Sequence, residues 1–128
     1  MLVGIDVIDV IRMEKFIQNE RFLNKYFTEY EISYVEKNDA RQTQSLAGIF
    51  ACKEAFLKAL GIGIGGGIAL NEIEIYHEES GKPQLRVNSS TGNIILKTMN
   101  VTEIGVSISH TDEICTAICF VKNGKRAT

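Results

Sequence analysis

The sequence has few cysteines, no basic excess and no long apolar run, and each absence excludes a class of protein. Its three cysteines, Cys52, Cys115 and Cys119, are an odd number without CxxC spacing, so they predict neither a disulfide framework nor a zinc site. They lie among apolar neighbours and are expected to be reduced core residues of a cytoplasmic protein. The formal net charge of -2 argues against a dedicated nucleic-acid-binding protein.

Membrane and targeting segments are not predicted either. No apolar run approaches the roughly 20 residues that span a bilayer. The first ten residues have no basic lead-in and include Asp6, so they do not resemble a signal peptide. The remaining composition is ordinary, with 45% hydrophobic and 23% charged residues among 128. We therefore expect one soluble domain over residues 1–128 with a core of its own.

The pattern of apolar residues predicts strands and helices that are partly segregated along the chain, which favours an α+β fold. Strands are expected at residues 1–10, 68–77, 84–87, 103–109 and 113–121, and helices at 10–18, 28–37, 42–60 and 90–100. Asp9 is a candidate N-cap for the first helix, and Thr28 with Glu31 forms a capping-box sequence before the second. Gly61 is a normal C-terminal signal for the third helix. The polar tail, residues 122–128, is expected to fray.

The predicted helix at 42–60 is apolar nearly all round from residue 46 onward. Its only charges in that segment are Lys53, Glu54 and Lys58. A helix with this profile is normally buried on most sides. Glu54 and Lys58 are four residues apart and share a face, so they either form a surface salt bridge or line a cleft that serves an anionic ligand.

Asp6 interrupts an apolar strand, where burying a carboxylate without a partner would cost several kcal/mol. It is either a strand-end acid that meets solvent or a helix N-terminus, or it is a metal ligand. Gly4 lies on the same strand face and is expected to leave space beside the carboxylate, as a hard cation needs. If Asp6 and Glu54 meet in space, they predict a magnesium site completed by water and phosphate oxygens. Lys58 would then neutralise phosphate oxygens.

Two further segments allow both a structural and a ligand-binding interpretation. The glycine-rich loop at 61–67 follows a helix and enters a strand, so it matches neither a Walker A loop nor a Rossmann turn. It is either a helix cap with a flexible connection or a place where backbone approaches a ligand. His110 lies between the last two strands beside Ser109 and Thr111, and it is either solvated or binds phosphate. His77 is expected to be structural.

Four motifs, which run in order along essentially the whole chain, resemble the bacterial holo-acyl-carrier-protein synthases, the small phosphopantetheinyl transferases. They are Gly4-Ile5-Asp6 with Arg12, the segment FACKEAFLKALG at 50–61, Gly81-Lys82-Pro83, and Ser107-Ile108-Ser109-His110-Thr111. The resemblance implies an α+β homotrimer with active sites between adjacent subunits. The implied reaction is the magnesium-dependent transfer of 4'-phosphopantetheine from coenzyme A to a serine of apo-acyl carrier protein, with release of adenosine 3',5'-bisphosphate. The resemblance implies a place in lipid and fatty-acid biosynthesis, although the sequence leaves open whether the natural carrier serves fatty-acid or specialised synthesis.

The resemblance also implies roles for individual residues. Asp6 and Glu54 are the expected magnesium ligands and, with Lys58, the expected catalytic residues. The residues expected to surround coenzyme A are Arg41, Lys58, Gly61, Lys82, Pro83, His110 and Thr111. Lys58 is expected at the pyrophosphate, and His110 and Thr111 near the 3'-phosphate. Either Glu54 or a metal-bound water polarised by the acids is expected to accept the proton of the carrier serine.

Arg12 falls on the helix that receives the carrier protein in that family, and Lys15 shares its helical face. This face is either an ordinary solvated surface or one that attracts an acidic carrier protein.

Two positions depart from the family pattern. Leu2 stands where a second glycine is usual, and Ile49 stands where an arginine is usual, so a phosphate-facing cation is lost or is supplied by Arg41. Ile49 also supports the alternative of a trimeric nucleotide-binding or scaffold protein that has lost the chemistry.

Overall fold

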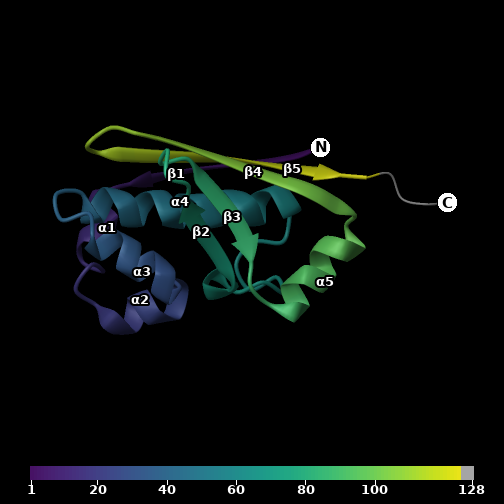
Figure 1. Cartoon of the computed structure of the whole chain (residues 1–128), viewed down its shortest axis with the longest axis horizontal. Helices are drawn as coiled ribbons and strands as arrows, with labels where there is room; N and C mark the ends of the chain where they lie inside the picture. The colour runs from purple at the N-terminus through teal and green to yellow at the C-terminus, as the bar shows by residue number, and fades with distance from the viewer. Residues whose placement is uncertain (125–128) are drawn as a thin grey trace.

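A computed structural model, which describes residues 1–124, has a long helix packed against one face of a three-stranded sheet (Figure 1). The sheet has the order β1-β5-β4 and is antiparallel throughout. Its strands are β1 (Leu2–Asp9), β4 (Val101–His110) and β5 (Ile114–Asn123), and the helix is α4 (Gln42–Leu60). A second, two-stranded sheet pairs β2 (Ile73–His77) with β3 (Pro83–Val87). The arrangement confirms the α+β expectation.

Figure 1 shows α4 between the three-stranded sheet and a second layer formed by short helices and the β2–β3 hairpin. The helices are α1 (Ile11–Glu14), α2 (Glu20–Tyr26), α3 (Glu29–Glu36) and α5 (Ser90–Thr98), and a 3-10 turn at Leu70–Glu72 leads into β2. Because α4 contacts the sheet on one side and α3 and β2 on others, it is apolar nearly all round. Among the helices of residues 1–124, none is long and apolar enough to cross a bilayer.

The ends of α4 and the start of α3 follow the sequence signals. α4 spans the predicted residues, and Gly61 ends it with a left-handed φ of 74°, donating its N–H to the carbonyls of Leu57 and Lys58. At α3, the Thr28 hydroxyl accepts from the Glu31 N–H and the Glu31 carboxylate accepts from the Thr28 N–H, which confirms the capping box.

The three cysteines are free and buried in the core, as expected. Burial raises the pKa of the Cys119 thiol to about 12 and also raises the pKa of Cys52 and Cys115. Thiols with raised pKa values stay protonated at neutral pH and act as small apolar side chains. Their role in the described structure is therefore packing.

The expected Asp9 cap is wrong, and so is the helix predicted to run to residue 18. Asp9 is the last residue of β1, because pairing with β5 continues through Val10, whose N–H donates to the carbonyl of Glu113. The following helix, α1, has four residues and no side-chain cap. A separate helix that the sequence did not predict, α2, begins after Asn19, whose side chain accepts from the Phe22 N–H.

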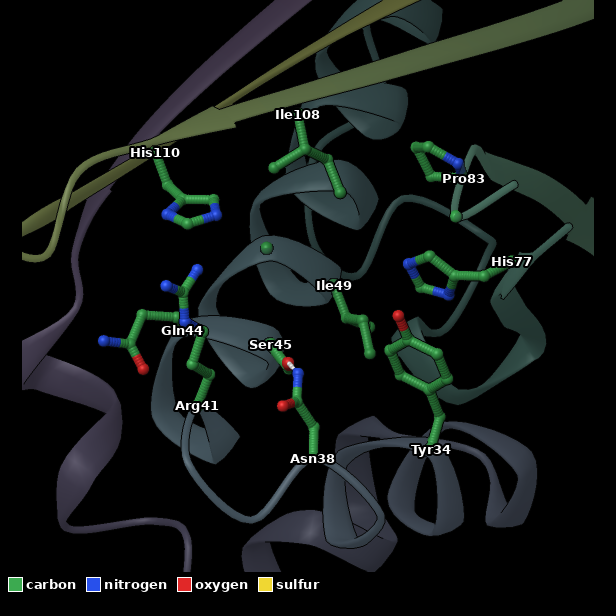
Figure 2. A pocket seen from close by; sticks show the side chains of 12 residues that line it. Tyr34, Asn38, Arg41, Gln44, Ser45, Ile49, His77, Pro83, Ile108 and His110 are labelled. Atoms are coloured by element: carbon green, nitrogen blue, oxygen red, sulfur yellow. Dashed lines mark hydrogen bonds between the residues drawn. The ribbon is translucent and has the colours of Figure 1, made fainter. Parts of the chain in front are cut away.

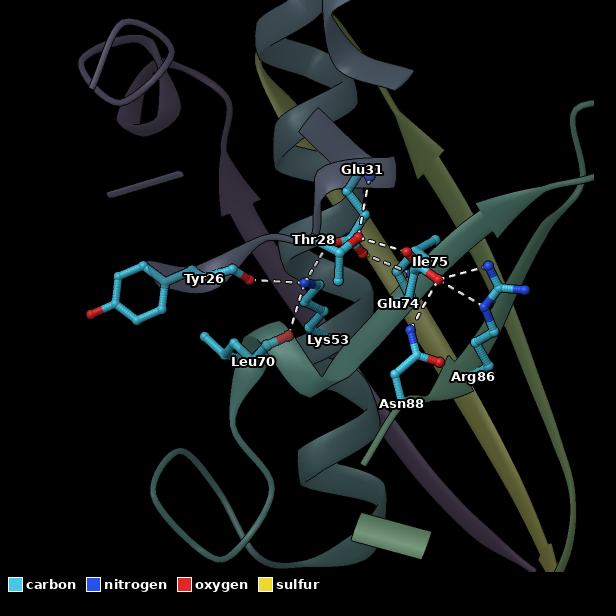
Figure 3. A network of polar contacts seen from close by, with 9 residues as sticks. All are labelled: Tyr26, Thr28, Glu31, Lys53, Leu70, Glu74, Ile75, Arg86 and Asn88. Carbon is cyan, nitrogen blue, oxygen red and sulfur yellow. Dashed lines mark hydrogen bonds and ion pairs between the residues drawn. The ribbon is translucent and has the colours of Figure 1, made fainter. Parts of the chain in front are cut away.

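The segment at 68–77 also differs from the expected alternating strand. Only Ile73–His77 forms a strand, and Glu74 is buried between its apolar neighbours Ile73 and Ile75. Its carboxylate accepts hydrogen bonds from Thr28, Arg86 and Asn88, which replace the water lost on burial (Figure 3).

At the C-terminal end, Lys122 and Asn123 continue β5 rather than fray, and residues 125–128 of the predicted tail lie outside the described residues.

A buried ion pair between Lys53 of α4 and Glu31 of α3 joins the elements of the second layer (Figure 3). The Lys53 Nζ lies 2.6 Å from Glu31 Oε1 and donates to the carbonyls of Tyr26 and Leu70 at 2.8 and 2.9 Å. The second Glu31 oxygen accepts from the Ile75 N–H. All three ammonium donors are thus used, as burial of a charge requires. Burial raises the pKa of Glu31 and lowers that of Lys53, and the attraction between the two charges opposes both shifts.

Gly4 allows the backbone of β1 to approach α4 closely. A Cβ at this position would overlap the carbonyl oxygen of Ala55 and lie 2.5 Å from the amide nitrogen of Ala59. The expectation that Gly4 leaves space for a ligand beside Asp6 is wrong, because helix backbone fills that space. The glycine instead sets the distance between the strand and the helix.

We predict that Gly4→Ala destabilises the fold by about 3 kcal/mol, since rigid backbone atoms must move to admit the methyl group. Urea denaturation measures the change in the free energy of unfolding. The matched control is Gly48→Ala on α4, where the added Cβ would meet the Ile108 side chain at 3.5 Å, an ordinary contact. This control should be neutral or stabilising by up to about 1 kcal/mol, because alanine favours helix. Similar losses in both variants would contradict the proposed close approach.

Candidate active site

Asp6 of β1 and Lys58 of α4 meet where the strand packs on the helix. The Lys58 Nζ lies 2.9 Å from Asp6 Oδ1 and 3.2 Å from the carbonyl oxygen of Ile5. Lys58 therefore pairs with Asp6 of β1. The i,i+4 salt bridge between Glu54 and Lys58, which the sequence also allowed, is not among the ion pairs of residues 1–124. The Lys58 side chain is 53% exposed, so its ammonium can also contact a ligand from solvent.

Glu54 lies one turn before Lys58 on α4 and is partly buried. Its pKa is raised by burial and by the negative charge of Asp6, while Lys58 acts to lower it. The charge of Asp6 thus acts on Glu54 as well as pairing with Lys58. Packing of β1 on α4 brings Asp6 to Lys58, with Glu54 one turn away on the same helix, which spacing along the sequence could not establish.

The donor set of this cluster is suited to a hard divalent cation. Two neighbouring carboxylates repel each other, and a bound cation would relieve the repulsion that contributes to the raised pKa of Glu54. Within the described chain, no group of three or more His, Cys, Asp or Glu residues is arranged to hold a metal. Two protein carboxylates fit magnesium, which commonly takes its remaining ligands from water and phosphates.

A second group of predicted residues lines a pocket of about 270 Å³ (Figure 2). The lining residues come from α3, α4, β2, β3, β4 and the loops between them: Tyr34, Asn38, Arg41, Gln44, Ser45, Gly48, Ile49, His77, Gly81, Pro83, Ile108 and His110. Three residues expected at coenzyme A, namely Arg41, Pro83 and His110, are therefore brought together. Asp6, Glu54 and Lys58 do not line this pocket, so the predicted site divides into two clusters within residues 1–124.

The remaining predicted nucleotide residues lie at the edges of these clusters. Lys82 is exposed in the turn before β3, and Thr111 follows His110 at the end of β4. The Thr111 hydroxyl accepts from the N–H groups of Glu113 and Ile114, so it shapes the hairpin as well as being near the pocket. Gly61 ends α4 close to Lys58 along the chain. In the loop after it, Gly63 and Gly65 have φ values of 60° and 82°, a backbone conformation that favours glycine.

Ile49, the residue that departs from the family pattern, lines the pocket and is almost fully buried. Among the described residues around this pocket, Arg41 alone carries a permanent positive charge. An anion that enters the pocket therefore depends on Arg41, assisted by neutral donors such as Asn38 and Ser45, which are hydrogen-bonded to each other.

Sequence reasoning did not identify Tyr34, and it treated His77 as structural. Their rings stack with centroids 4.0 Å apart and an interplanar angle of 1°, and both line the pocket. The two residues lie in different elements, α3 and β2, so no spacing within the sequence could have paired them.

On another surface, Arg12 and Lys15 are exposed at α1 and its C-cap, so both side chains of the predicted basic face are accessible to a partner.

Comparison with known proteins identifies the family of this chain. The profile of the 4'-phosphopantetheinyl transferase superfamily matches residues 2–119. The holo-[acyl-carrier-protein] synthase of Fusobacterium nucleatum is 36% identical and covers 94% of this chain and 99% of its own. The corresponding protein of Ruminiclostridium cellulolyticum is 39% identical and covers 97% and 93%.

Solved structures show the same fold. The Helicobacter pylori holo-[acyl-carrier-protein] synthase in complex with coenzyme A superposes with a TM-score of 0.81 at 28% identity, covering 94% of this chain and all of the other. The Bacillus anthracis synthase, in complex with coenzyme A (3',5'-ADP), gives 0.78 at 31% identity and covers 96% of each chain. The chain therefore belongs to the 4'-phosphopantetheinyl transferase superfamily, in the group of enzymes named holo-[acyl-carrier-protein] synthase.

Proposed function

We propose that this enzyme transfers 4'-phosphopantetheine from coenzyme A to a serine of an apo-acyl carrier protein, in the cytoplasm and for fatty-acid biosynthesis. The serine oxygen forms a bond to the β-phosphorus, the pyrophosphate bond breaks, and adenosine 3',5'-bisphosphate leaves. The observation that carries the proposal is the convergence of Asp6, Glu54 and Lys58 from two elements. The coenzyme A complexes of the Helicobacter pylori and Bacillus anthracis proteins support the choice of substrate.

Each residue of the cluster has a distinct role in this proposal. Asp6 and Glu54 would hold magnesium, which would neutralise negative charge on the pyrophosphate when bound. Lys58 neutralises phosphate oxygens from its exposed position. Either Glu54 or a water polarised by the two acids would accept the proton of the carrier serine.

The proposal includes a homotrimer with active sites between subunits. The outer face of the three-stranded sheet, which α4 does not cover, exposes apolar side chains: Val3, Ile5, Val7 and Phe120 are 42–60% exposed. Contiguous exposed apolar surface of this kind is typical of subunit interfaces. A neighbouring copy on this face would supply the pocket cluster with Arg41 and His110 that one chain keeps separate from Asp6.

The direct test mixes the purified protein with coenzyme A, magnesium and apo-carrier protein and weighs the carrier by mass spectrometry. We expect a phosphopantetheine adduct, formed at least about 100-fold more slowly by Asp6→Asn and Glu54→Gln, because each removes a charge that the transition state needs. Glu103→Gln, at an exposed position on β4, is the matched control and should keep its rate. The absence of an adduct with the unaltered protein would favour the non-catalytic scaffold.

A second prediction concerns the stability cost of the active-site charge. Because the folded-state pKa of Glu54 is raised, the folded chain holds its proton more tightly than the unfolded chain. The wild type should therefore lose stability relative to Glu54→Gln as the pH rises from below about 4.3, the ordinary glutamate value, through the raised value. At pH 7 without magnesium, Glu54→Gln should melt a few degrees higher than the wild type.

Thermal unfolding from pH 4 to 8 measures this difference, with Glu103→Gln as the control that should show none. Added magnesium chloride should raise the melting temperature of the wild type but not that of Glu54→Gln. Parallel pH profiles of the melting temperature for the wild type and Glu54→Gln would show that folding does not raise the pKa of Glu54. That outcome would contradict the prediction.

A third prediction concerns carrier-protein docking. Arg12→Glu reverses an exposed charge on α1 and should raise the KM for an acidic carrier protein about tenfold, because complementary charges steer encounter and orientation. The Kd for coenzyme A, measured by calorimetry, should not change. Lys97→Glu, an equally exposed reversal on α5, controls for net charge and should alter neither value. If Arg12→Glu weakened the binding of coenzyme A and of the carrier protein equally, the proposed docking role of Arg12 would be contradicted.

A further inference from the structure

The two ends of the pocket differ in chemistry. Figure 2 shows Arg41 and His110 toward one end, and Tyr34, His77 and Pro83 toward the other. The first end suits an anion, because a guanidinium forms charge-assisted hydrogen bonds with phosphate oxygens. The second is flat and aromatic, built by the stacked rings of Tyr34 and His77 and by Pro83, the strand partner of His77. A ligand that matches both ends carries a phosphate and a planar ring.

His77 has an unusual hydrogen-bonding state. Its Nδ1 is buried and has no hydrogen-bond partner among the described residues. Protonating the ring would leave a buried N–H donor without an acceptor, which is costly, and burial lowers the pKa of His77. The imidazole is therefore neutral at pH 7.

Figure 2 shows the far edge of the His77 ring pointing into the pocket, away from its strand. A neutral imidazole offers one donor and one acceptor, and the buried nitrogen is not available to a ligand. The pocket-facing edge can thus make one uncharged hydrogen bond. This property suits the edge of a heterocyclic base, whereas a phosphate would be better served by a cation such as Arg41.

We propose that His77 is a specificity-determining residue that contacts the adenine base of the coenzyme A nucleotide, with Tyr34 holding its ring by stacking. The inference rests on the proposed function for the identity of the nucleotide. The position of His77 on β2, across the hairpin from Pro83, places it on the aromatic end of the pocket rather than at the anion-binding end. His77 thus acts in substrate choice, not in the transfer step.

The test compares two nucleotides that differ only in the base, adenosine 3',5'-bisphosphate and uridine 3',5'-bisphosphate, by calorimetry with the full-length protein. The wild type should prefer the adenosine form. His77→Phe keeps a flat ring against Tyr34 but removes the nitrogen. It should weaken the adenosine form about tenfold and the uridine form less than twofold, which corresponds to the loss of one hydrogen bond. Arg41→Gln, the control, should weaken both nucleotides by the same factor.

An unchanged adenosine-to-uridine ratio in His77→Phe would overturn the proposal, whether both affinities fall together or neither does. So would a wild type that binds neither nucleotide or does not discriminate between them. If thermal unfolding shows that His77→Phe folds poorly, Tyr34→Leu tests the same aromatic end of the pocket. The ratio of adenosine to uridine affinity should then fall at least threefold, because the ring that orients His77 is lost. No carrier protein or magnesium is needed, so loss of base discrimination and loss of transferase activity are separate outcomes.

Discussion

The close packing of β1 against α4 is the constraint on which the candidate active site depends. Gly4 lets the two backbones come together at Ala55 and Ala59. Two residues further along the same strand face, Asp6 then reaches Lys58 at 2.9 Å. A bulkier residue at position 4 would push the strand away from the helix and separate these charges. A packing requirement and a chemical requirement are thus met by one contact between a strand and a helix.

The neighbouring residues Lys53 and Glu54 show how α4 serves both the core and the site. Successive positions on a helix point about 100° apart. Lys53 therefore faces α3 and β2, where its charge is fully paired with Glu31, while Glu54 faces the side on which β1 packs and keeps a raised pKa. Breaking a buried pair is strongly destabilising, so the pair fixes the rotation of α4 about its axis. That rotation determines where the Glu54 carboxylate lies.

The parts of the structure that local signals control were predictable from the sequence. The bounds of α4 and the capping box at Thr28 and Glu31 follow from periodicity and caps. Misplaced charges marked Asp6, Glu54 and Lys58 as candidates, but only the packing of β1 on α4 brings Asp6 to Lys58. Other features depend on contacts between distant segments and could not be predicted. Glu74 is buried because Arg86 and Asn88 satisfy it, and Tyr34 stacks on His77 only after α3 docks beside β2.

The pairing of β1 has a consequence for the order in which the molecule can assemble. Within the described chain β1 pairs only with β5, and Leu2 lies opposite Val121, so β1 and its sheet neighbour are separated by all the other described helices and strands along the sequence. Contacts of such long sequence separation are formed late and slow the search for the native state. During synthesis, the segment carrying Asp6 must remain without its sheet partner until β5 has left the ribosome, and during that time its row of valines and isoleucines is open to chaperones.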